Sequence, residues 1–298
     1  MRVAALSREE KKTESVEIAE DVVADLIPPA AMIGAESSIY SEIIEIGHYR
    51  NLMFFLCWRD LKVRYKQTLL GASWAIAQPL FTMGVFSIVF GRIAKIPSEG
   101  IPYPLFSLSA LIPWIFFSGA LTRASLAIVN NGHLIAKIYF PRLIVPLSSV
   151  LTGGVDLGIS LVFLIAMMLL FGYVPPLRFF AILPFIVLWI ILLALGIGLT
   201  FSALHIRFRD IGHALPLMMQ LWMYLTPVIY PSSTVPEKYQ WLLPMNPMTG
   251  AIDSFRSLLF GLPWNAQAAG ISVTMTLIFL CIGIVYFHKR STTFADVV

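Results

Sequence analysis

Charged residues are scarce in this sequence, and most of the acidic ones lie near its start. Only 13% of the 298 residues are Asp, Glu, Lys or Arg, whereas 58% are hydrophobic. Soluble domains usually have about 25% charged residues, so this deficit excludes an ordinary soluble domain and predicts a polytopic membrane protein. Ten of the seventeen carboxylates precede residue 46. The formal charge of +4 therefore reports membrane topology, and nucleic-acid binding is not expected.

Cysteine is almost absent, which argues against a disulfide framework or a thiolate metal site. Cys57 and Cys281 are isolated in apolar helical stretches, and we expect two free, buried side chains. The five histidines fall near the expected membrane edges and form no cluster. We therefore predict no metal and no catalytic site in this chain.

Acidic residues are also rare inside the apolar stretches, where Asp156 is the one deep carboxylate. A membrane enzyme acting on glycolipids would need clustered carboxylates, and a proton-coupled carrier would need several acids or histidines. A lone acidic residue inside a membrane span, such as Asp156, more often forms a hydrogen bond between packed helices than acts as a catalyst. Arg123 either pairs with it or extends towards the membrane edge.

The sequence contains no GxxxxGK[ST] loop, because no Gly-Lys pair occurs anywhere in it. The chain therefore lacks this route to nucleotide hydrolysis. If it drives transport uphill, a partner must supply the energy.

What the sequence does have is a series of long apolar stretches, and it predicts an all-α membrane protein with six transmembrane helices. Each stretch is near the roughly 20 residues that a bilayer core requires. A polar, acidic segment precedes them, with no cleavable signal peptide, and we expect residues 1–37 to form a mobile cytoplasmic tail before a membrane domain over 38–298. The expected spans are 71–92, 102–129, 143–172, 179–205, 211–230 and 266–288.

Orientation follows from Lys and Arg in the short flanking segments. With a cytoplasmic N-terminus, eleven of them lie inside and five outside. We therefore expect a multi-pass protein with both termini cytoplasmic. A short helix after Ser38 should run towards His48.

Residues 49–68 predict an amphipathic helix at the membrane interface, in contact with lipid. Phe54, Trp58, Leu61 and Tyr65 fall on one stripe, and cationic residues flank them. Rings at the acyl boundary and cations at the headgroups suit such a helix. The candidate interfacial residues are Trp58, Arg59, Lys62, Arg64 and Lys66.

Residues 236–262, between the last two spans, predict a re-entrant helical hairpin at the outer side. Asn246 and Pro247 suit the cap and first position of a helix, which should end near Phe260 with Gly261 as its stop. Such a helix is about 21 Å long, too short to cross the bilayer. An ordinary extracytoplasmic loop is the alternative.

A short cytoplasmic segment, 130–141, is the candidate contact for a partner protein. Asn130 or Asn131 could cap a helix that ends at Pro141. An amphipathic helix of this kind suits a groove on another protein, although a loop helix resting on the membrane fits the pattern equally well. Its candidate contact residues are Asn131, His133, Leu134, Lys137, Ile138 and Tyr139.

Aromatic residues make up 13% of the sequence and gather in the first and fifth spans. Rings deep in a span could stack on the faces of sugar rings, but core packing or lipid contact is the more frequent role. The candidates are Trp74, Phe81, Phe86, Trp222, Tyr224 and Tyr230.

Four stretches together resemble the membrane subunits of bacterial ABC-2-type exporters for polysaccharides, the O-antigen and teichoic-acid permeases. They are WRDLKVRYKQTLLGASWAIAQPL at 58–80, NNGHLIAKIYFPR at 130–142, LTPVIYP at 225–231 with NPMTGAIDSFR at 246–256, and FADVV at the C-terminus. The resemblance covers about residues 40–298. The acidic N-terminal extension departs from the family pattern.

The resemblance implies a homodimer in the bacterial inner membrane, bound to two copies of a separate ATPase that holds ATP and Mg²⁺. The cargo would be a lipid-linked polysaccharide of the O-antigen kind. The segment 131–139 would dock on the ATPase, and the aromatic candidates would contact the glycan. Trp241, Asn246, Pro247 and Arg256 would form the outer gate.

Three alternatives stay open. The cargo could be teichoic acid or capsule, or a small drug or lipid carried by the same fold. A membrane-embedded glycolipid enzyme is the remote alternative, and the lone Asp156 argues against it.

Overall fold

A computed structural model describes residues 39–66, 71–135, 137 and 140–291, and within these residues the chain is helical with no strand. Contacts divide it into two units, Met1–Tyr49 and Arg50–Val298. In the first unit, α2 (Ile39–His48) is the helix expected to run towards His48. The expected tail, 1–37, and the proposed cap Ser38 lie outside the described residues.

The second unit has five helical segments long and apolar enough to cross a membrane, and they match five of the six expected spans within a few residues. The first, Gly71–Ile93, joins η1 (Gly71–Ser73), α4 (Trp74–Phe86) and η2 (Ser87–Ile93). The third joins α7 (Ile144–Leu151) and α8 (Gly153–Leu170). The other three are α5 (Tyr103–Asn130), α9 (Leu177–Arg207) and α13 (Ala266–Ser291).

The expected fifth span, 211–230, is shorter than predicted. Its helix, α10 (Ile211–Leu225), has 15 residues and a length of about 22 Å, less than a bilayer core of about 30 Å. It ends because Pro227 disfavours helical geometry at Thr226, whose ψ of 142° is extended. Val228 and Ile229, which follow the helix, are buried.

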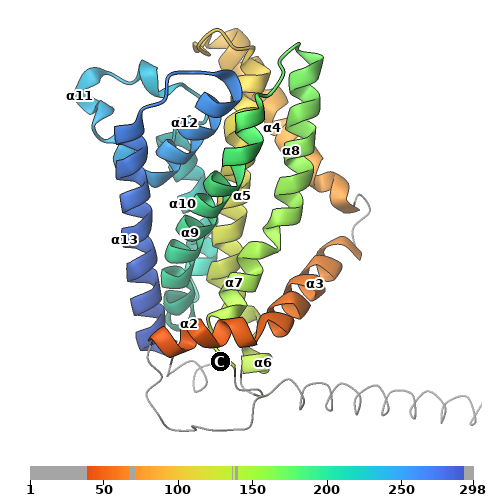
Figure 1. The fold of residues 1–298 in the computed structure, drawn as a ribbon, viewed down its shortest axis with the longest axis vertical. Coiled ribbons are helices and arrows are strands. Elements are labelled where there is room, and N and C mark those ends of the chain that lie inside the picture. The colour runs from red at the N-terminus through yellow and green to blue at the C-terminus, as the bar shows by residue number, and fades with distance from the viewer. Residues whose placement is uncertain (1–38, 67–70, 136, 138–139, 292–298) are drawn as a thin grey trace, which may run out of the picture. The chain divides into compact units, whose positions relative to one another are not determined.

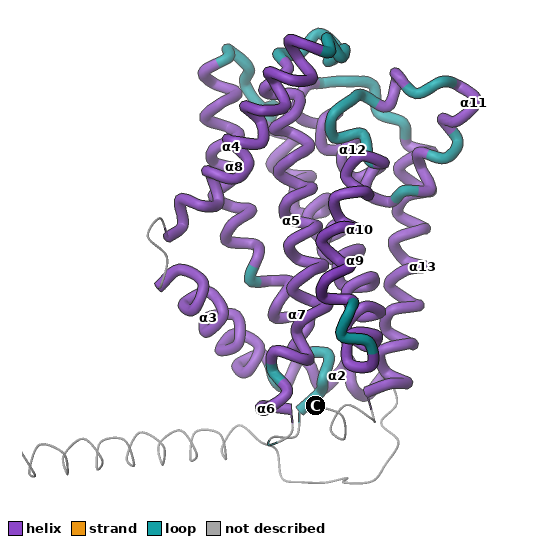
Figure 2. The backbone as a smooth tube through the Cα atoms, turned by 180° about the vertical axis from the view of Figure 1, so that it is seen from behind, coloured by secondary structure: helices purple, strands orange, loops and turns teal. Residues whose placement is uncertain are grey.

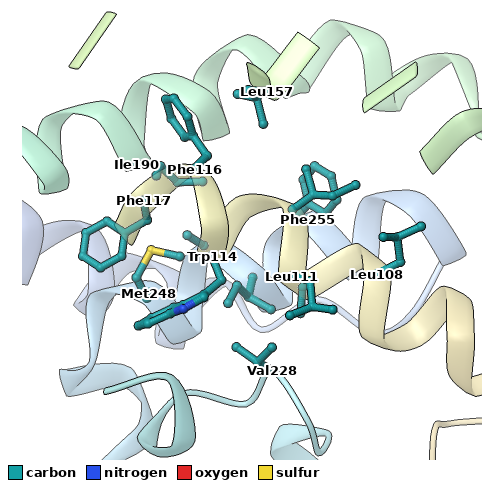
Figure 3. Packing of buried hydrophobic residues seen from close by; sticks show 14 of the residues in the cluster. Leu108, Leu111, Trp114, Phe116, Phe117, Leu157, Ile190, Val228, Met248 and Phe255 are labelled. Carbon is teal, nitrogen blue, oxygen red and sulfur yellow. The ribbon is translucent and has the colours of Figure 1, made fainter. Parts of the chain in front are cut away.

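The core of this unit is built around α5. In α5, 78% of the most apolar stretch is buried, whereas the buried share of the corresponding stretch is 17% to 33% in the other four segments. Figure 3 shows Leu111, Trp114 and Phe117 of α5 with Met248 and Phe255 of a later helix, α12 (Pro247–Phe260). The other segments present apolar side chains outwards, as helices in contact with lipid do.

Close helix contact is clearest between α9 and α13. A Cβ atom on Gly283 would lie 2.0 Å from the carbonyl oxygen of Gly196, and one on Gly196 would lie 2.6 Å from the backbone of Leu280. Small residues of this kind let transmembrane helices approach and gain dispersion contacts. Any larger side chain at either glycine would force the two helices apart.

Several short elements lie at the two ends of this unit. α6 (Gly132–Ile135) and α11 (Glu237–Gln240) lie at opposite ends, as Figures 1 and 2 show. Two short 3₁₀ turns, η3 (Ser232–Thr234) and η4 (Leu243–Met245), accompany α11. α3 (Arg50–Lys66) is oblique to the long helices and packs on α7 (Figure 2).

Candidate functional site

The segment proposed to contact a partner forms a shorter helix than expected. α6 covers Gly132–Ile135, because Asn130 completes α5 and Asn131 follows as its C-terminal cap. The Asn131 side chain therefore does not cap α6; its Nδ2 donates to the carbonyl oxygen of Ala127 at 2.8 Å. Its main-chain oxygen accepts the first bonds of α6, from Leu134 and Ile135 at 3.0 and 3.1 Å.

Exposure differs along this segment. His133 and Lys137 are exposed, Leu134 is half-buried and Ile135 is buried. Ile138 and Tyr139, two of the predicted contact residues, lie outside the described residues. Among the described residues of 131–137, the exposed side chains therefore carry one imidazole, on α6, and one ammonium group, just after it.

A hydrogen bond joins α3 to the start of this segment. Arg59 Nη2 donates to Asn131 Oδ1 at 2.6 Å and also contacts Asp60 at 2.8 Å. Asn131 is buried and caps the end of α5, so a charged hydrogen bond connects α3 to the residue that precedes α6. The sequence placed both residues in functional segments but gave no sign that they touch.

The predicted aromatic stripe of α3 faces outwards at its start. Phe54 and Trp58 stack with ring centroids 6.5 Å apart, and Lys62 Nζ lies 5.5 Å from the Trp58 ring. Lys66 is exposed as well. Such a surface of rings and ammonium groups suits the boundary between headgroups and acyl chains.

The other end of α3 contacts Asp156 of α8. Arg64 Nη1 and the Tyr65 hydroxyl each donate to a different oxygen of this carboxylate. Burial and the hydrogen bond to Asp156 raise the pKa of Tyr65 to about 12. Asp156 is thus bound by α3 and forms no ion pair with Arg123, which was one of the two arrangements expected for that arginine. The Arg123 Nε instead donates to the Ser149 carbonyl at 3.0 Å.

The two cysteines are free, as expected, but only one is partly buried. The Cys57 thiol donates to the Ser148 carbonyl at 3.4 Å, which adds to the packing of α3 on α7, and burial raises its pKa. Cys281 is exposed on α13, which corrects the prediction that both would be buried.

The candidate channel aromatics divide into two groups. Trp74 and Phe81 of α4 and Tyr224 of α10 are exposed, with 52%, 70% and 48% of their surface accessible. Phe86 is buried and packs edge-on against Phe90 with centroids 5.4 Å apart. Hydropathy could not separate these groups, because a ring that faces lipid and a ring in the core look alike in sequence.

Trp222 of α10 belongs to the core of the unit. Its ring lies edge-on to Phe117 and Trp114, with centroids 5.2 and 6.3 Å away. Its Nε1 donates to Asn246 Oδ1 at 3.1 Å. Tyr230 is half-buried, and its hydroxyl donates to the Tyr224 carbonyl at 3.3 Å.

Asn246 and Pro247 begin α12 as the sequence predicted. Asn246 Oδ1 accepts from the Met248 amide at 3.2 Å, and its Nδ2 donates to Thr226 Oγ1 at 2.9 Å. Gly261, with a φ of 71°, ends the helix after Phe260. Trp241, another gate candidate, is exposed beside α11.

Arg256 of α12 is buried and binds the main chain of two other segments. Its guanidinium donates to the carbonyls of Pro227, Val228 and Phe106 at 2.7, 2.9 and 3.1 Å. It also lies 3.7 Å from the centroid of the Phe106 ring. The carbonyls of Pro227 and Val228 lie just after the end of α10, outside any helix, and the buried arginine supplies donors for them.

Comparison with known proteins gives a consistent result. The sequence profile of the ABC-2 type transporter family matches residues 51–260. The chain is 30% identical over 252 residues to the O-antigen export system permease protein RfbA of Klebsiella pneumoniae, covering 85% of this chain and 96% of that protein. The protein of the same name from Myxococcus xanthus is 28% identical, with 85% and 97% covered. The polysialic acid transport protein KpsM of Escherichia coli is 24% identical, with 78% and 90% covered.

Proposed function

The chain belongs to the ABC-2 type transporter family, and we propose that it is the membrane subunit of an ATP-driven exporter for a lipid-linked polysaccharide of the O-antigen kind. One observation carries this proposal: the relatives named as O-antigen export permeases match over 96% to 97% of their own length. A likeness of that extent concerns nearly the whole of each relative and 85% of this chain, so it is more than a shared motif.

The proposal includes a separate ATPase that holds ATP and Mg²⁺, since the sequence has no GxxxxGK[ST] loop. Two ATPase copies would bind a homodimer of this chain. The exposed His133 and Lys137 beside α6 suit a contact with an acidic or polar groove. Closure of the ATPase pair would then move α6, and the bond from Asn131 to Arg59 would carry the movement to α3.

The passage would lie between two copies of the chain. Trp74 and Phe81 of α4 and Tyr224 of α10 leave their rings exposed in one copy, as stacking on sugar faces requires. Phe86 and Trp222 support the wall from inside. In the proposed orientation both termini are cytoplasmic, α3 lies at the inner interface and α11–α12 form the outer gate.

The similarity to a polysialic acid transport protein favours capsular polysaccharide as a second cargo. Both cargoes are long glycans, and the same stacking surface would serve either. The chemical identity of the retained glycan separates them.

Depletion of the protein in its host tests the proposal. Surface polysaccharide and cell-internal, lipid-linked polysaccharide are separated and quantified by immunoblotting after electrophoresis. We expect long-chain glycan to disappear from the surface and to accumulate inside on its lipid. Unchanged amounts in both pools would remove polysaccharide as the cargo and leave a small drug or lipid.

A further inference from the structure

A cavity of about 370 Å³ with mixed apolar and charged walls lies between α3, α4, α5 and α8. Its walls include two arginines, Arg64 and Arg123, one carboxylate, Asp156, and the polar side chains of Gln78 and Ser118. Its volume is within the range of small-molecule sites, about 300 to 1,000 Å³. Charged groups in a cavity between membrane helices call for a polar or charged occupant, because hydrocarbon cannot satisfy them.

The charges in this cavity do not balance. Arg64 forms an ion pair with one oxygen of Asp156, and the Tyr65 hydroxyl binds the other oxygen. The carboxylate is therefore already neutralised by α3. Arg123 adds a second guanidinium to the same cavity, so its side chains have a net charge of +1.

Arg123 keeps its two terminal nitrogens available. Its Nε donates to the Ser149 carbonyl at 3.0 Å. Within the described part of the chain, no other hydrogen bond and no ion pair holds this guanidinium. A partly buried cation with open donors among membrane helices is costly unless an anion completes it.

Two glycines make room for the Arg123 guanidinium. A Cβ atom on Gly153 would lie 2.0 Å from Nη2, and one on Gly119 would lie 3.0 Å from Nη1. Any side chain at Gly153 would therefore displace the arginine head. The two glycines thus leave space for the guanidinium between α5 and α8, and the bond from Nε to Ser149 orients it there.

The surroundings indicate an anion attached to an apolar chain. Arg123 lies seven residues before the end of α5, about 10 Å along the helix from α6. Trp74 of α4 and Val155 and Val162 of α8 are exposed on the helices that border the cavity. A headgroup in the cavity could therefore leave its hydrocarbon chain on an apolar surface.

We propose that this cavity binds the phosphate or pyrophosphate headgroup of the lipid that carries the polysaccharide, with Arg123 as the main ligand and Arg64 beside it. A planar guanidinium binds phosphate oxygens through two parallel N–H donors, which an ammonium group cannot do. The identity of that lipid rests on the proposed function. The presence of an anion site rests on the geometry of Arg123, Gly153 and Asp156 alone.

Binding of radiolabelled farnesyl pyrophosphate to the full-length chain in nonionic detergent tests the proposal. This probe joins an isoprenoid chain to a pyrophosphate, and farnesol and inorganic pyrophosphate serve as competitors. We expect it to bind at least tenfold more tightly than either competitor. Arg123→Gln should weaken binding by about ten- to a hundredfold, since hydrogen bonds to charged groups have that effect.

A pair of glycine variants keeps the test valid if Arg123→Gln does not fold. Gly153→Ala should weaken binding because the added methyl group displaces the guanidinium, although the variant removes no charged group. Gly154→Ala is the matched control, because a Cβ atom there has no neighbour within 4 Å. Both changes add the same methyl group to the first turn of α8, and their melting temperatures verify folding.

Any of three results would overturn the proposal. Equal affinity for farnesol and farnesyl pyrophosphate, or full binding by Arg123→Gln and Gly153→Ala, would show that the cavity does not recognise phosphate. Equal competition by inorganic pyrophosphate would show that a free anion, not a lipid, is the ligand. The depletion experiment tests the proposed function separately. Binding of the probe can be absent while depletion still blocks polysaccharide export, and binding can be present while depletion leaves export unchanged.

Discussion

The indole Nε1 of Trp222 donates a 3.1 Å hydrogen bond to Oδ1 of Asn246, and this contact joins α10 to the first turn of α12. The same oxygen accepts from the Met248 amide, so one atom both caps α12 and holds the tryptophan. A shift of α10 therefore disturbs the start of the proposed gate helix. In the proposed transport cycle, this contact connects the passage wall to the outer gate.

Replacing Asn246 with Ala should destabilise the protein by about 2 to 3 kcal/mol, because it removes a helix cap and the side-chain bonds to Trp222 and Thr226. The measurement is thermal or denaturant unfolding in detergent. Asn265→Ala is a matched control: Asn265 Oδ1 also binds a helix amide, that of Ala268, but has no tryptophan partner. We expect a loss of about 1 kcal/mol there.

Trp222→Phe keeps an aromatic ring in the core and removes the indole donor. Combined with Asn246→Ala in a double-mutant cycle, it should reveal a coupling of about 1 kcal/mol between α10 and α12. Strict additivity of the two changes would contradict the proposed link.

Replacing Arg256 with Met should be far more damaging than its place on a short outer helix suggests. The buried guanidinium binds three carbonyls, and its removal takes the side-chain donor away from those of Pro227 and Val228. We expect a loss of about 3 to 5 kcal/mol and no surface polysaccharide.

Arg256→Lys should recover only part of this loss, since one ammonium group cannot reach all three carbonyls. The exposed Arg178→Gln is the control and should leave the melting temperature unchanged. A stable Arg256→Met variant that exports normally would refute the role assigned to this arginine.

Reversing the charge of Lys137 should separate ATP hydrolysis from export. Lys137 is exposed beside α6, so Lys137→Glu should fold normally yet weaken the contact with the ATPase. In proteoliposomes containing both subunits, polysaccharide translocation should fall at least fivefold while basal ATP hydrolysis persists.

Leu134→Ala, which shortens a half-buried side chain of the same helix, should act in the same direction. The exposed Lys95→Glu, just after η2 and outside the proposed gate and ATPase contact, is the control and should export normally. Normal export by Lys137→Glu and Leu134→Ala together would place the ATPase contact elsewhere.

We expect the exposed aromatic rings to contribute to polysaccharide export and to contribute little to the stability of the protein. Trp74→Ala and Tyr224→Ala should reduce polysaccharide export several-fold and leave the melting temperature almost unchanged, because both rings are about half exposed. Phe86→Ala should instead destabilise the protein by about 3 to 5 kcal/mol, since it opens a cavity in the core. Export is measured as surface polysaccharide by immunoblotting.

Phe185→Ala provides the matched control, since this ring is as exposed as Phe81 but lies on α9, outside the proposed passage. Its export should equal that of the wild type. Equal export by Trp74→Ala and Tyr224→Ala would favour a small cargo that needs no stacking surface.

The sequence alone determined the membrane class, the position of five long apolar segments and the start and end of α12. These features depend on local composition or on neighbouring residues: apolar runs of bilayer length, and Asn246, Pro247 and Gly261 at fixed positions around one helix. The early end of α10 was also present in the sequence as Pro227, but the apolar residues after it concealed the break.

Which residues contact each other depends on the tertiary structure. Whether Asp156 pairs with Arg64 or Arg123, and which carbonyls Arg256 binds, depends on contacts between residues 28 to 150 positions apart. The tertiary structure also determines that Trp74 is exposed and that Phe86 and Trp222 pack in the core. Lipid tails are as apolar as a protein core, so hydropathy cannot tell these surroundings apart, and only the packing of α4 and α10 on α5 separates them.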